Sequence, residues 1–165
     1  MLHLEKGETM RPMRYEKRKM PRSYAEAVID TCDFFVMATV GSGNEPYCVP
    51  LSMAREGDWL YFHSALEGHK IDNLKHNKRV CISCVGETQI PPGKFTVQYK
   101  SAIIFGTAQE IVSKDEKIHA LKIICERYTP DNMAAFGEAI ERSLDHTAVW
   151  KIYIDEISGK GNEPD

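Results

Sequence analysis

The chain of 165 residues has no apolar run approaching the roughly 18 residues that a transmembrane helix needs. Its first residues also lack the hydrophobic segment of a secretory signal peptide. The net charge is only −3 at pH 7, which argues against wholesale binding to nucleic acid or to a membrane surface. We therefore expect a cytoplasmic protein with neither nucleic acid nor a membrane among its partners.

The sequence also lacks the glycine-rich fingerprints of a P-loop and of a Rossmann dinucleotide site. Its five cysteines are an odd number without framework spacing, which fits reduced thiols in the cytosol. Cys81 and Cys84 do spell C-x-x-C, but they lie in an apolar, β-branched run that predicts a strand. Positions i and i+3 of a strand face opposite sides, so buried cysteines acting as small hydrophobes are favoured over a redox pair or zinc knuckle.

What is present predicts one globular domain, because hydrophobic residues make up 42% of the chain and charged residues 27%. Residues 1–22 show no sustained periodicity and carry a cluster of Arg and Lys, so we expect a flexible basic leader in which Met1 and Met10 are alternative starts. The domain itself is expected over residues 23–159, and residues 160–165 are expected to form a tail.

Alternating strand and helix patterns follow the leader. Capping boxes at residues 23–26 and 113–116 open helices, and Pro130 opens another. Expected helices cover 23–33, a short stretch from about 70 to 77, 113–128 and 129–144; expected strands cover 34–40, 47–53, 59–63, 79–85, 97–111 and 147–154. The first three strands have hairpin-length connections, which favours an antiparallel meander, and Gly106 predicts a bulge. This pattern predicts a mainly β (α+β) fold: a six-stranded, partly open antiparallel β-barrel with peripheral helices.

One segment predicts an anion site. Residues 59–77 pass from an aromatic strand through small and polar residues to a glycine, and then into a short helix with Lys70 in its first turn. This order aims backbone N–H groups and the positive end of the helix dipole at one spot. His63, Ser64, His69 and Lys70 add side-chain donors. The alternative is an ordinary strand-to-helix turn with a solvated lysine.

Histidines in the same segment raise the question of a metal. His63, His69 and His76 lie close in sequence, yet no carboxylate or thiolate is clearly placed to complete a ligand set. We therefore expect no metal site. A histidine beside a bound group is well suited to relay a proton near neutral pH.

In order, these segments resemble the pyridoxamine 5′-phosphate oxidase-like FMN-binding split barrels, and within that superfamily the nitroimidazole-resistance proteins. The likeness extends from about Met10 to Gly159. It is carried by residues 38–40, 45–52, 60–70, 99–106 and 145–152. The combination of Pro-Leu-Ser at 50–52 with Phe-His-Ser-Ala at 62–65 and Gly-His-Lys at 68–70 is its most specific part.

The resemblance implies that residues 23–159 form a split β-barrel that dimerises, with FMN in a groove between the subunits. By similarity, the isoalloxazine edge is flanked by main-chain groups of Pro50, Leu51 and Ser52. The phosphate and ribityl chain are held by His63, Ser64, His69 and Lys70, with help from Asn73. The resemblance also implies that Tyr99 and Ser101 contribute across the interface and that Trp150 covers the ring. The resemblance also implies a functional histidine, for which His63 is our first choice and His69 the alternative.

Several functions are compatible with this resemblance. The first is an FMN-dependent reductase of small oxidised compounds such as nitroimidazoles, whose electron donor, NAD(P)H or a protein, docks transiently. The second is a flavin- or haem-binding protein that stores or senses without turnover, although only His146 lies late enough to serve haem. The third is a structural dimer with an empty groove. Oxidation of pyridoxamine phosphate is not expected, because an arginine-rich substrate site and a C-terminal Arg/His motif are missing.

Overall fold

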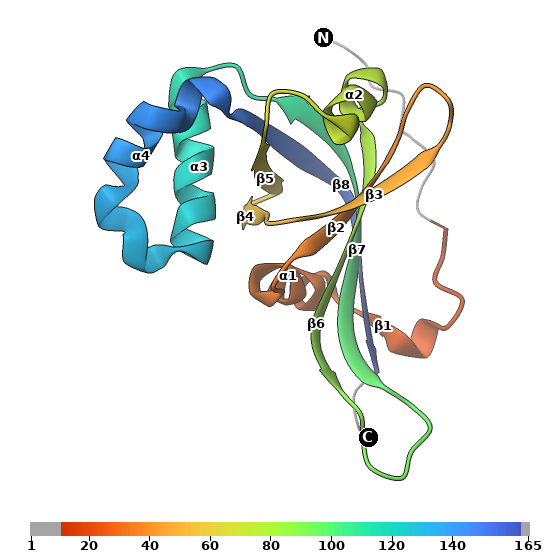
Figure 1. Ribbon diagram of the computed structural model, residues 1–165. Helices are drawn as coiled ribbons and strands as arrows, with labels where there is room; N and C mark the ends of the chain where they lie inside the picture. Colours follow the sequence, from red (N-terminus) through yellow and green to blue (C-terminus); the bar gives the residue numbers. More distant parts are fainter. Residues whose placement is uncertain (1–10, 163–165) are drawn as a thin grey trace.

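The computed structural model describes residues 11–162 and contains one antiparallel sheet (Figure 1). The sheet follows the order β3-β2-β6-β7-β8-β5-β4, and β1 pairs with β8. Its strands are β1 (Lys19–Met20), β2 (Phe35–Val40), β3 (Pro46–Leu51), β4 (Ala54–Glu56), β5 (Trp59–Ser64), β6 (Arg79–Gln89), β7 (Gln98–Glu110) and β8 (Ala148–Asn162). The helices are α1 (Arg22–Thr31), α2 (His69–His76), α3 (Lys114–Tyr128) and α4 (Phe136–Ser143), with 3₁₀ turns at Glu16–Arg18, Pro130–Ala135 and Leu144–His146.

The mainly β, α+β fold is confirmed, and the sheet is open, with β3 and β4 at opposite ends of its order. The count of six strands was wrong, because eight are present within residues 11–162. The two additional strands, β1 and β4, contain two and three residues, too few for an alternating pattern to reveal them. The predicted meander was also wrong for its third strand, expected at residues 59–63, which does not pair with the second. β2 and β3 form a hairpin, but β5 pairs with β8, because β4 turns the chain towards the other end of the sheet.

Two element boundaries differ from the prediction for physical reasons. β8 continues through Gly159 and Gly161 to Asn162. The sequence did not predict this extension, because glycine is depleted in strands. A Cβ at Gly161 would lie 2.6 Å from the Tyr24 hydroxyl, so glycine lets α1 approach the strand. The expected tail at 160–165 thus begins inside β8. Similarly, β1 lies within the stretch expected as a flexible leader and pairs with β8, while residues 1–10 and 163–165 lie outside the described part.

The helix expected over residues 129–144 is broken into a 3₁₀ turn, α4 and a second 3₁₀ turn. None of the α4 side chains is fully buried; Phe136 and Ile140 pack only partly buried against the second core cluster, so packing does little to extend this segment into one regular helix. The helix expected over residues 113–128 is present as α3. Within the described residues, no helix combines the length and the apolar character that crossing a bilayer requires.

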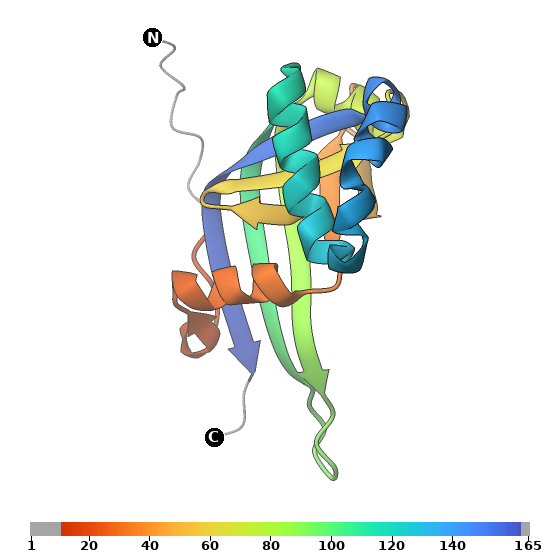
Figure 2. The same ribbon diagram turned by 90° about the vertical axis from the view of Figure 1, so that its left-hand side faces the viewer.

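The bent sheet has an inner and an outer face, each with its own core. The inner core is closed by α1 and α2; it includes Phe35, Met37, Leu60, Phe62, Ile82, Ile104, Trp150 and Ile152. The second cluster lies between the sheet and α3, where Leu121 and Ile124 pack with Tyr61 and Val149. Figure 2 shows α3 and α4 in front of the upper part of the sheet, with α1 below them. The helices therefore cover only part of the sheet.

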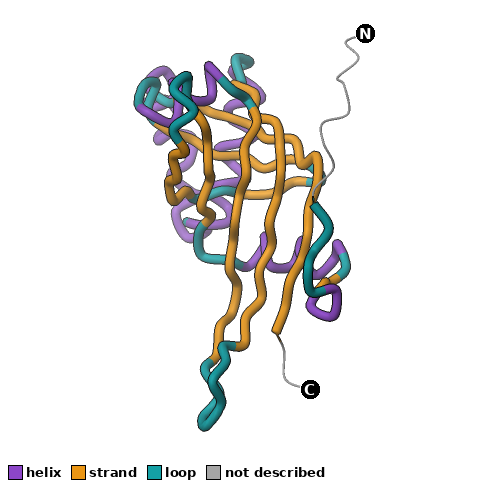
Figure 3. Tube along the Cα trace, turned by 90° about the vertical axis from the view of Figure 1, so that its right-hand side faces the viewer, coloured by secondary structure: helices purple, strands orange, loops and turns teal. Residues whose placement is uncertain are grey.

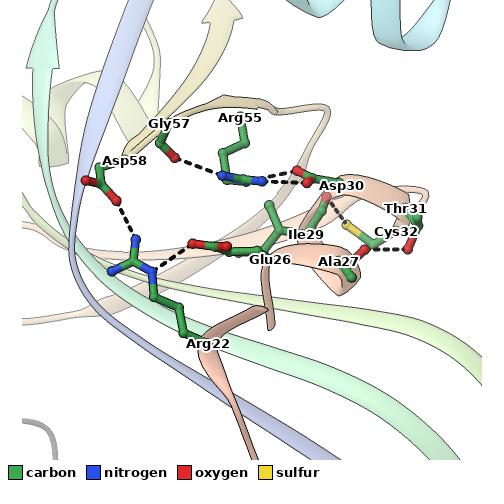
Figure 4. Close-up of polar contacts among 10 residues, drawn as sticks. All are labelled: Arg22, Glu26, Ala27, Ile29, Asp30, Thr31, Cys32, Arg55, Gly57 and Asp58. Atoms are coloured by element: carbon green, nitrogen blue, oxygen red, sulfur yellow. Dashed lines mark hydrogen bonds and ion pairs between the residues drawn. The ribbon is translucent and has the colours of Figure 1, made fainter. Parts of the chain in front are cut away.

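Charged side chains connect α1 to the turn between β4 and β5 (Figure 4). Arg22 pairs with Glu26, at 2.7 Å, and with Asp58. Arg55 binds the Asp30 carboxylate through two nitrogens, at 2.9 Å and 2.5 Å, and donates to the Gly57 carbonyl at 3.0 Å. Exposed pairs of this kind contribute at most about 1 kcal/mol each, so they orient α1 more than they stabilise the fold.

Candidate functional site

The strand–turn–helix segment has the geometry expected of an anion site. β5 ends at Ser64, and Gly68 precedes α2 with a φ of 129°, a conformation that favours glycine. The Gly68 carbonyl accepts the N–H groups of Ile71 (2.8 Å) and Asp72 (3.1 Å). The N–H groups of His69 and Lys70 precede these bonds, as at any helix N-terminus, and point with the positive end of the dipole towards the turn.

Three elements bring side chains to this turn. The His63 side chain, at the end of β5, keeps contact with solvent, and its pKa is lowered, first by partial desolvation of the imidazole and then by the positive charge of Lys70 on α2. The His69 ring lies against Tyr47 of β3, with ring centroids 4.1 Å apart and an interplanar angle of 32°. The predicted donors His63, His69 and Lys70 therefore gather where β5, α2 and β3 meet, and His63 is held in its neutral form near pH 7.

Two of the other predicted phosphate and ribityl contacts have partners inside the protein. The Ser64 hydroxyl donates to the Ala65 carbonyl at 2.8 Å, which shapes the turn. Asn73 is only 4% exposed, and its side-chain N–H₂ donates to the Thr39 hydroxyl at 3.0 Å. A Cβ at Gly41 would lie 2.5 Å from the Asn73 side-chain oxygen, so the loop after β2 fits closely over this amide. Asn73 thus anchors α2 to β2.

We expect Asn73→Ala to lower the free energy of unfolding by about 1–3 kcal/mol, because it leaves Thr39 without its buried partner. Urea denaturation followed by circular dichroism measures this loss. The matched control is Asp72→Ala on the exposed side of the same helix, which should change stability little. Equal unfolding midpoints for the two variants would contradict the anchoring role.

The residues predicted to flank a flavin edge lie where β3 ends. Pro50 pairs with Val36 on the outer face, Leu51 packs against the inner core, and Ser52 is exposed. Sequence reasoning missed the residue that holds the following backbone. The Tyr128 hydroxyl donates to the Met53 carbonyl (2.8 Å) and accepts the Met53 N–H (3.2 Å). A contact across 75 residues of sequence leaves no local pattern by which it might have been found.

Tyr99 and Ser101 lie at the far end of β7 from α2. Tyr99 pairs with Asn162, whereas Thr107 pairs with Arg79 just after α2. At the usual rise of a strand, Tyr99 and Thr107 are roughly 25 Å apart. Figure 1 shows α2 at one end of the molecule and the β6–β7 hairpin at the other. Within one chain these two residues do not meet the His63–Lys70 group.

Trp150 faces the inner core and not the outer face of the sheet. It is 3% exposed, and its ring is stacked on Phe62 with a centroid distance of 6.4 Å and an interplanar angle of 11°. Its indole N–H has no hydrogen-bond partner. The Trp150 side chain is therefore enclosed by its own chain. The resemblance had implied instead that Trp150 covers the flavin ring.

One large part of the sheet carries no helix, and we call it the outer sheet face. Strand register places its members on the same side of β2, β3, β6 and β7: Val36, Ala38, Cys48, Pro50, Cys81, Ser83, Ile103 and Phe105. All of them are half-buried or exposed, and Figure 3 shows these strands in front with the helices behind. The adjoining β6–β7 hairpin exposes Ile90, Phe95 and Val97, of which Phe95 is fully exposed. Apolar side chains that remain accessible on one face of a sheet are typical of interaction surfaces.

Within residues 11–162, no three side chains of His, Cys, Asp or Glu come together in a way that would hold a metal ion. His63 and His69 have the neighbours described above, a lysine and a tyrosine. The residues at the turn are suited instead to an anion, because they present N–H groups and positive charge.

Comparison with known proteins supports the resemblance. The sequence profile of the family described as pyridoxamine 5′-phosphate oxidase matches residues 21–161. A candidate 5-nitroimidazole antibiotic resistance protein from Bacteroides thetaiotaomicron is similar in structure, with a TM-score of 0.74, 28% identity, and coverage of 88% of this chain and 90% of that one.

Two further relatives extend the comparison. An uncharacterized protein of Rhizobium meliloti is 26% identical over 150 residues, which cover 87% of this chain and 93% of that protein. The FAD and haem binding protein of Mycobacterium smegmatis shares the fold, with a TM-score of 0.76, 22% identity, and coverage of 89% of this chain and 74% of that one. Because the family profile spans most of the sequence, the chain belongs to the pyridoxamine 5′-phosphate oxidase family.

Proposed function

We propose that this protein binds FMN and acts as an FMN-dependent reductase of small oxidised compounds, of which nitroimidazoles are the model substrates. The observation that carries the proposal is the convergence of His63 and Lys70 with the N-terminus of α2. These groups suit a phosphate monoester, which needs charge-assisted donors and a helix dipole. The structural similarity to the Bacteroides protein favours nitro compounds as substrates.

The proposed site is shared by two copies of the chain. The outer sheet face offers the apolar surface on which a second copy would pack, and such a face is poorly suited to water. Packing two copies through this face also provides a way for Tyr99 and Ser101 of one subunit to approach the α2 site of the other. This supports a homodimer in which the flavin lies at the interface.

His63 is our candidate for proton transfer. When bound, FMN supplies the hydride and electron chemistry. In the protein without FMN, the lowered pKa of His63 keeps its imidazole neutral near pH 7; a bound phosphate shifts that pKa back towards its ordinary value, where the ring can accept and return a proton. Lys70, in the first turn of α2 and near His63, holds the phosphate. A reductase of this kind takes its electrons from a donor that docks transiently, either NAD(P)H or a protein.

Turnover is tested anaerobically by following the visible spectrum. We expect NADPH, or a chemical reductant if no nicotinamide is accepted, to bleach the flavin bands, and a nitroimidazole to restore them with loss of the nitro group's own absorption. The matched control is a non-nitrated imidazole, which should leave the reduced flavin unchanged. A flavin that is never reoxidised by nitro compounds would favour the binding or sensing alternative, and a Soret band would favour haem.

Protonation of His63 predicts a pH dependence of FMN binding. A phosphate placed beside His63 favours the imidazolium and raises its pKa from the lowered value of the free protein. By linkage, binding then takes up a proton and tightens as the pH falls. We expect the affinity ratio of wild type to His63→Gln to be about three- to tenfold larger at pH 6 than at pH 8.

Fluorescence titration of FMN at both pH values measures this ratio. The titration of the FMN phosphate itself affects wild type and variant alike, so it cancels in the ratio. A ratio that is independent of pH would mean that His63 does not contact the phosphate.

A further inference from the structure

The last turn of α3 holds the chain on both sides of the β2–β3 hairpin. Arg127 donates to the carbonyl of Cys32, which comes before β2, at 2.7 Å. The hydroxyl of the next residue, Tyr128, makes hydrogen bonds of 2.8 Å and 3.2 Å to the backbone of Met53, which follows β3. The Arg127 guanidinium also lies over the Tyr128 ring, 5.0 Å from its centroid, and so restrains that ring. The base of the hairpin is therefore tied to a helix that itself packs on the sheet.

The two hydrogen bonds of Tyr128 fix the orientation of one peptide plane. Burial raises the pKa of Tyr128, so its hydroxyl keeps the proton that it donates to the Met53 carbonyl, and a lone pair accepts the Met53 N–H. The Ser52–Met53 peptide is trans, so its N–H and its C=O point in opposite directions. Because the Met53 N–H points to Tyr128, the Ser52 carbonyl points away from α3. Ser52 is exposed, whereas Met53 is fully buried.

Strand β3 connects this carbonyl to the proposed phosphate site. Tyr47, near the start of β3, lies against His69 of α2. Ser52 follows five residues later, which is about 17 Å away at the usual rise of a strand. β3 is an end strand of the sheet described over residues 11–162, so one of its long edges is open. An elongated ligand with an anionic group at one end and an N–H donor at the other can reach both places. FMN is such a ligand, because its phosphate and the N3–H of its pyrimidine ring lie at opposite ends.

We propose that Tyr128 is a positioning residue for the flavin ring, a role that rests on the proposed binding of FMN. By holding both backbone groups of Met53, Tyr128 fixes the Ser52 carbonyl as the acceptor for the flavin N3–H. An acceptor that is already oriented avoids the cost of ordering the backbone when the ligand binds. Tyr128 itself does not touch the ligand and acts only through the Ser52–Met53 peptide.

The test compares FMN with 3-methyl-FMN, whose N3 carries a methyl group in place of its hydrogen. In fluorescence titrations, wild-type protein should bind FMN at least about tenfold more tightly, because the methylated ring cannot donate to Ser52. In Tyr128→Phe, which removes only the hydroxyl, this preference should fall below about threefold, because the peptide is no longer held. A general weakening of the fold would lower the affinity for both ligands and leave their ratio unchanged.

The outcomes separate this role from the proposed function. Equal binding of the two ligands by the wild type would overturn the positioning role while FMN binding stands, and so would a tenfold preference that persists in Tyr128→Phe. A wild type that binds neither ligand would overturn the proposed function, and the role of Tyr128 with it. Tyr153→Phe is the matched control, because Tyr153 is an exposed tyrosine on β8, and it should keep the wild-type ratio.

Hydrogen exchange of the cofactor-free protein is a second readout. The Met53 amide should be protected in the wild type and in Tyr153→Phe, and should exchange at least about tenfold faster in Tyr128→Phe. Should Tyr128→Phe fail to fold, the wild type still provides a test. A wild-type Met53 amide that exchanges as fast as an unstructured one would contradict the hold of Tyr128 on this peptide.

Discussion

Ile103→Glu is expected to turn the proposed homodimer into a monomer with greatly weakened flavin binding. Ile103 lies in the middle of the outer sheet face, between Ser83 of β6 and Ser158 of β8 in the strand register. In the single chain it is only half-buried, so a glutamate there has access to water and the fold tolerates it. At an interface, each subunit would bury an unpaired carboxylate, which costs several kcal/mol. We expect the dimer dissociation constant to rise by at least about a thousandfold.

Light scattering over a range of protein concentrations measures this change, and FMN titration measures the associated loss of binding. Val112→Glu is the matched control, because Val112 is an exposed apolar residue that follows β7 outside the outer sheet face. It should leave both the dimer and the flavin in place. A dimer that persists in Ile103→Glu with FMN bound would place the interface on another surface.

Lys70→Ala is expected to weaken FMN binding by about ten- to hundredfold while leaving riboflavin binding almost unchanged. Lys70 lies in the first turn of α2, close enough to His63 for its charge to affect that ring. Removing it loses a charge-assisted hydrogen bond to the phosphate, worth roughly 1.5–3 kcal/mol. Riboflavin has no phosphate, so it reports any general damage to the ring pocket.

The control is Lys75→Ala, at the exposed end of the same helix, where both ligands should bind as they do to wild type. Titrating FMN and riboflavin into the two variants gives four affinities. Equal losses for FMN and riboflavin in Lys70→Ala would indicate a structural defect. An unchanged FMN affinity would mean that the phosphate lies elsewhere.

The features that sequence reasoning predicted correctly depend on local patterns. The strand–turn–helix from Trp59 to His76 was found because its strand, glycine and helix follow one another directly. The opposite orientation of Cys81 and Cys84 followed from the two-residue period of a strand and is confirmed, with Cys84 in the core and Cys81 on the outer sheet face. The capping box at Ser113 likewise marked the start of α3.

What sequence reasoning missed depends on contacts between distant segments. The pairing of β5 with β8 and the two hydrogen bonds between Tyr128 and Met53 join segments that no local pattern connects. Asn73 looked like a ligand-binding amide, because the sequence does not show that Thr39 lies beneath it.

The identity of the bound cofactor tests the central claim most directly. The protein is purified under mild conditions and denatured, and the released small molecules are identified and quantified by mass spectrometry and absorbance. Our account predicts FMN at close to one molecule per chain, because we propose that Lys70, His63 and the N-terminus of α2 bind a terminal phosphate. Recovery of FAD or haem instead, or failure of the cofactor-free protein to take up added FMN, would contradict it.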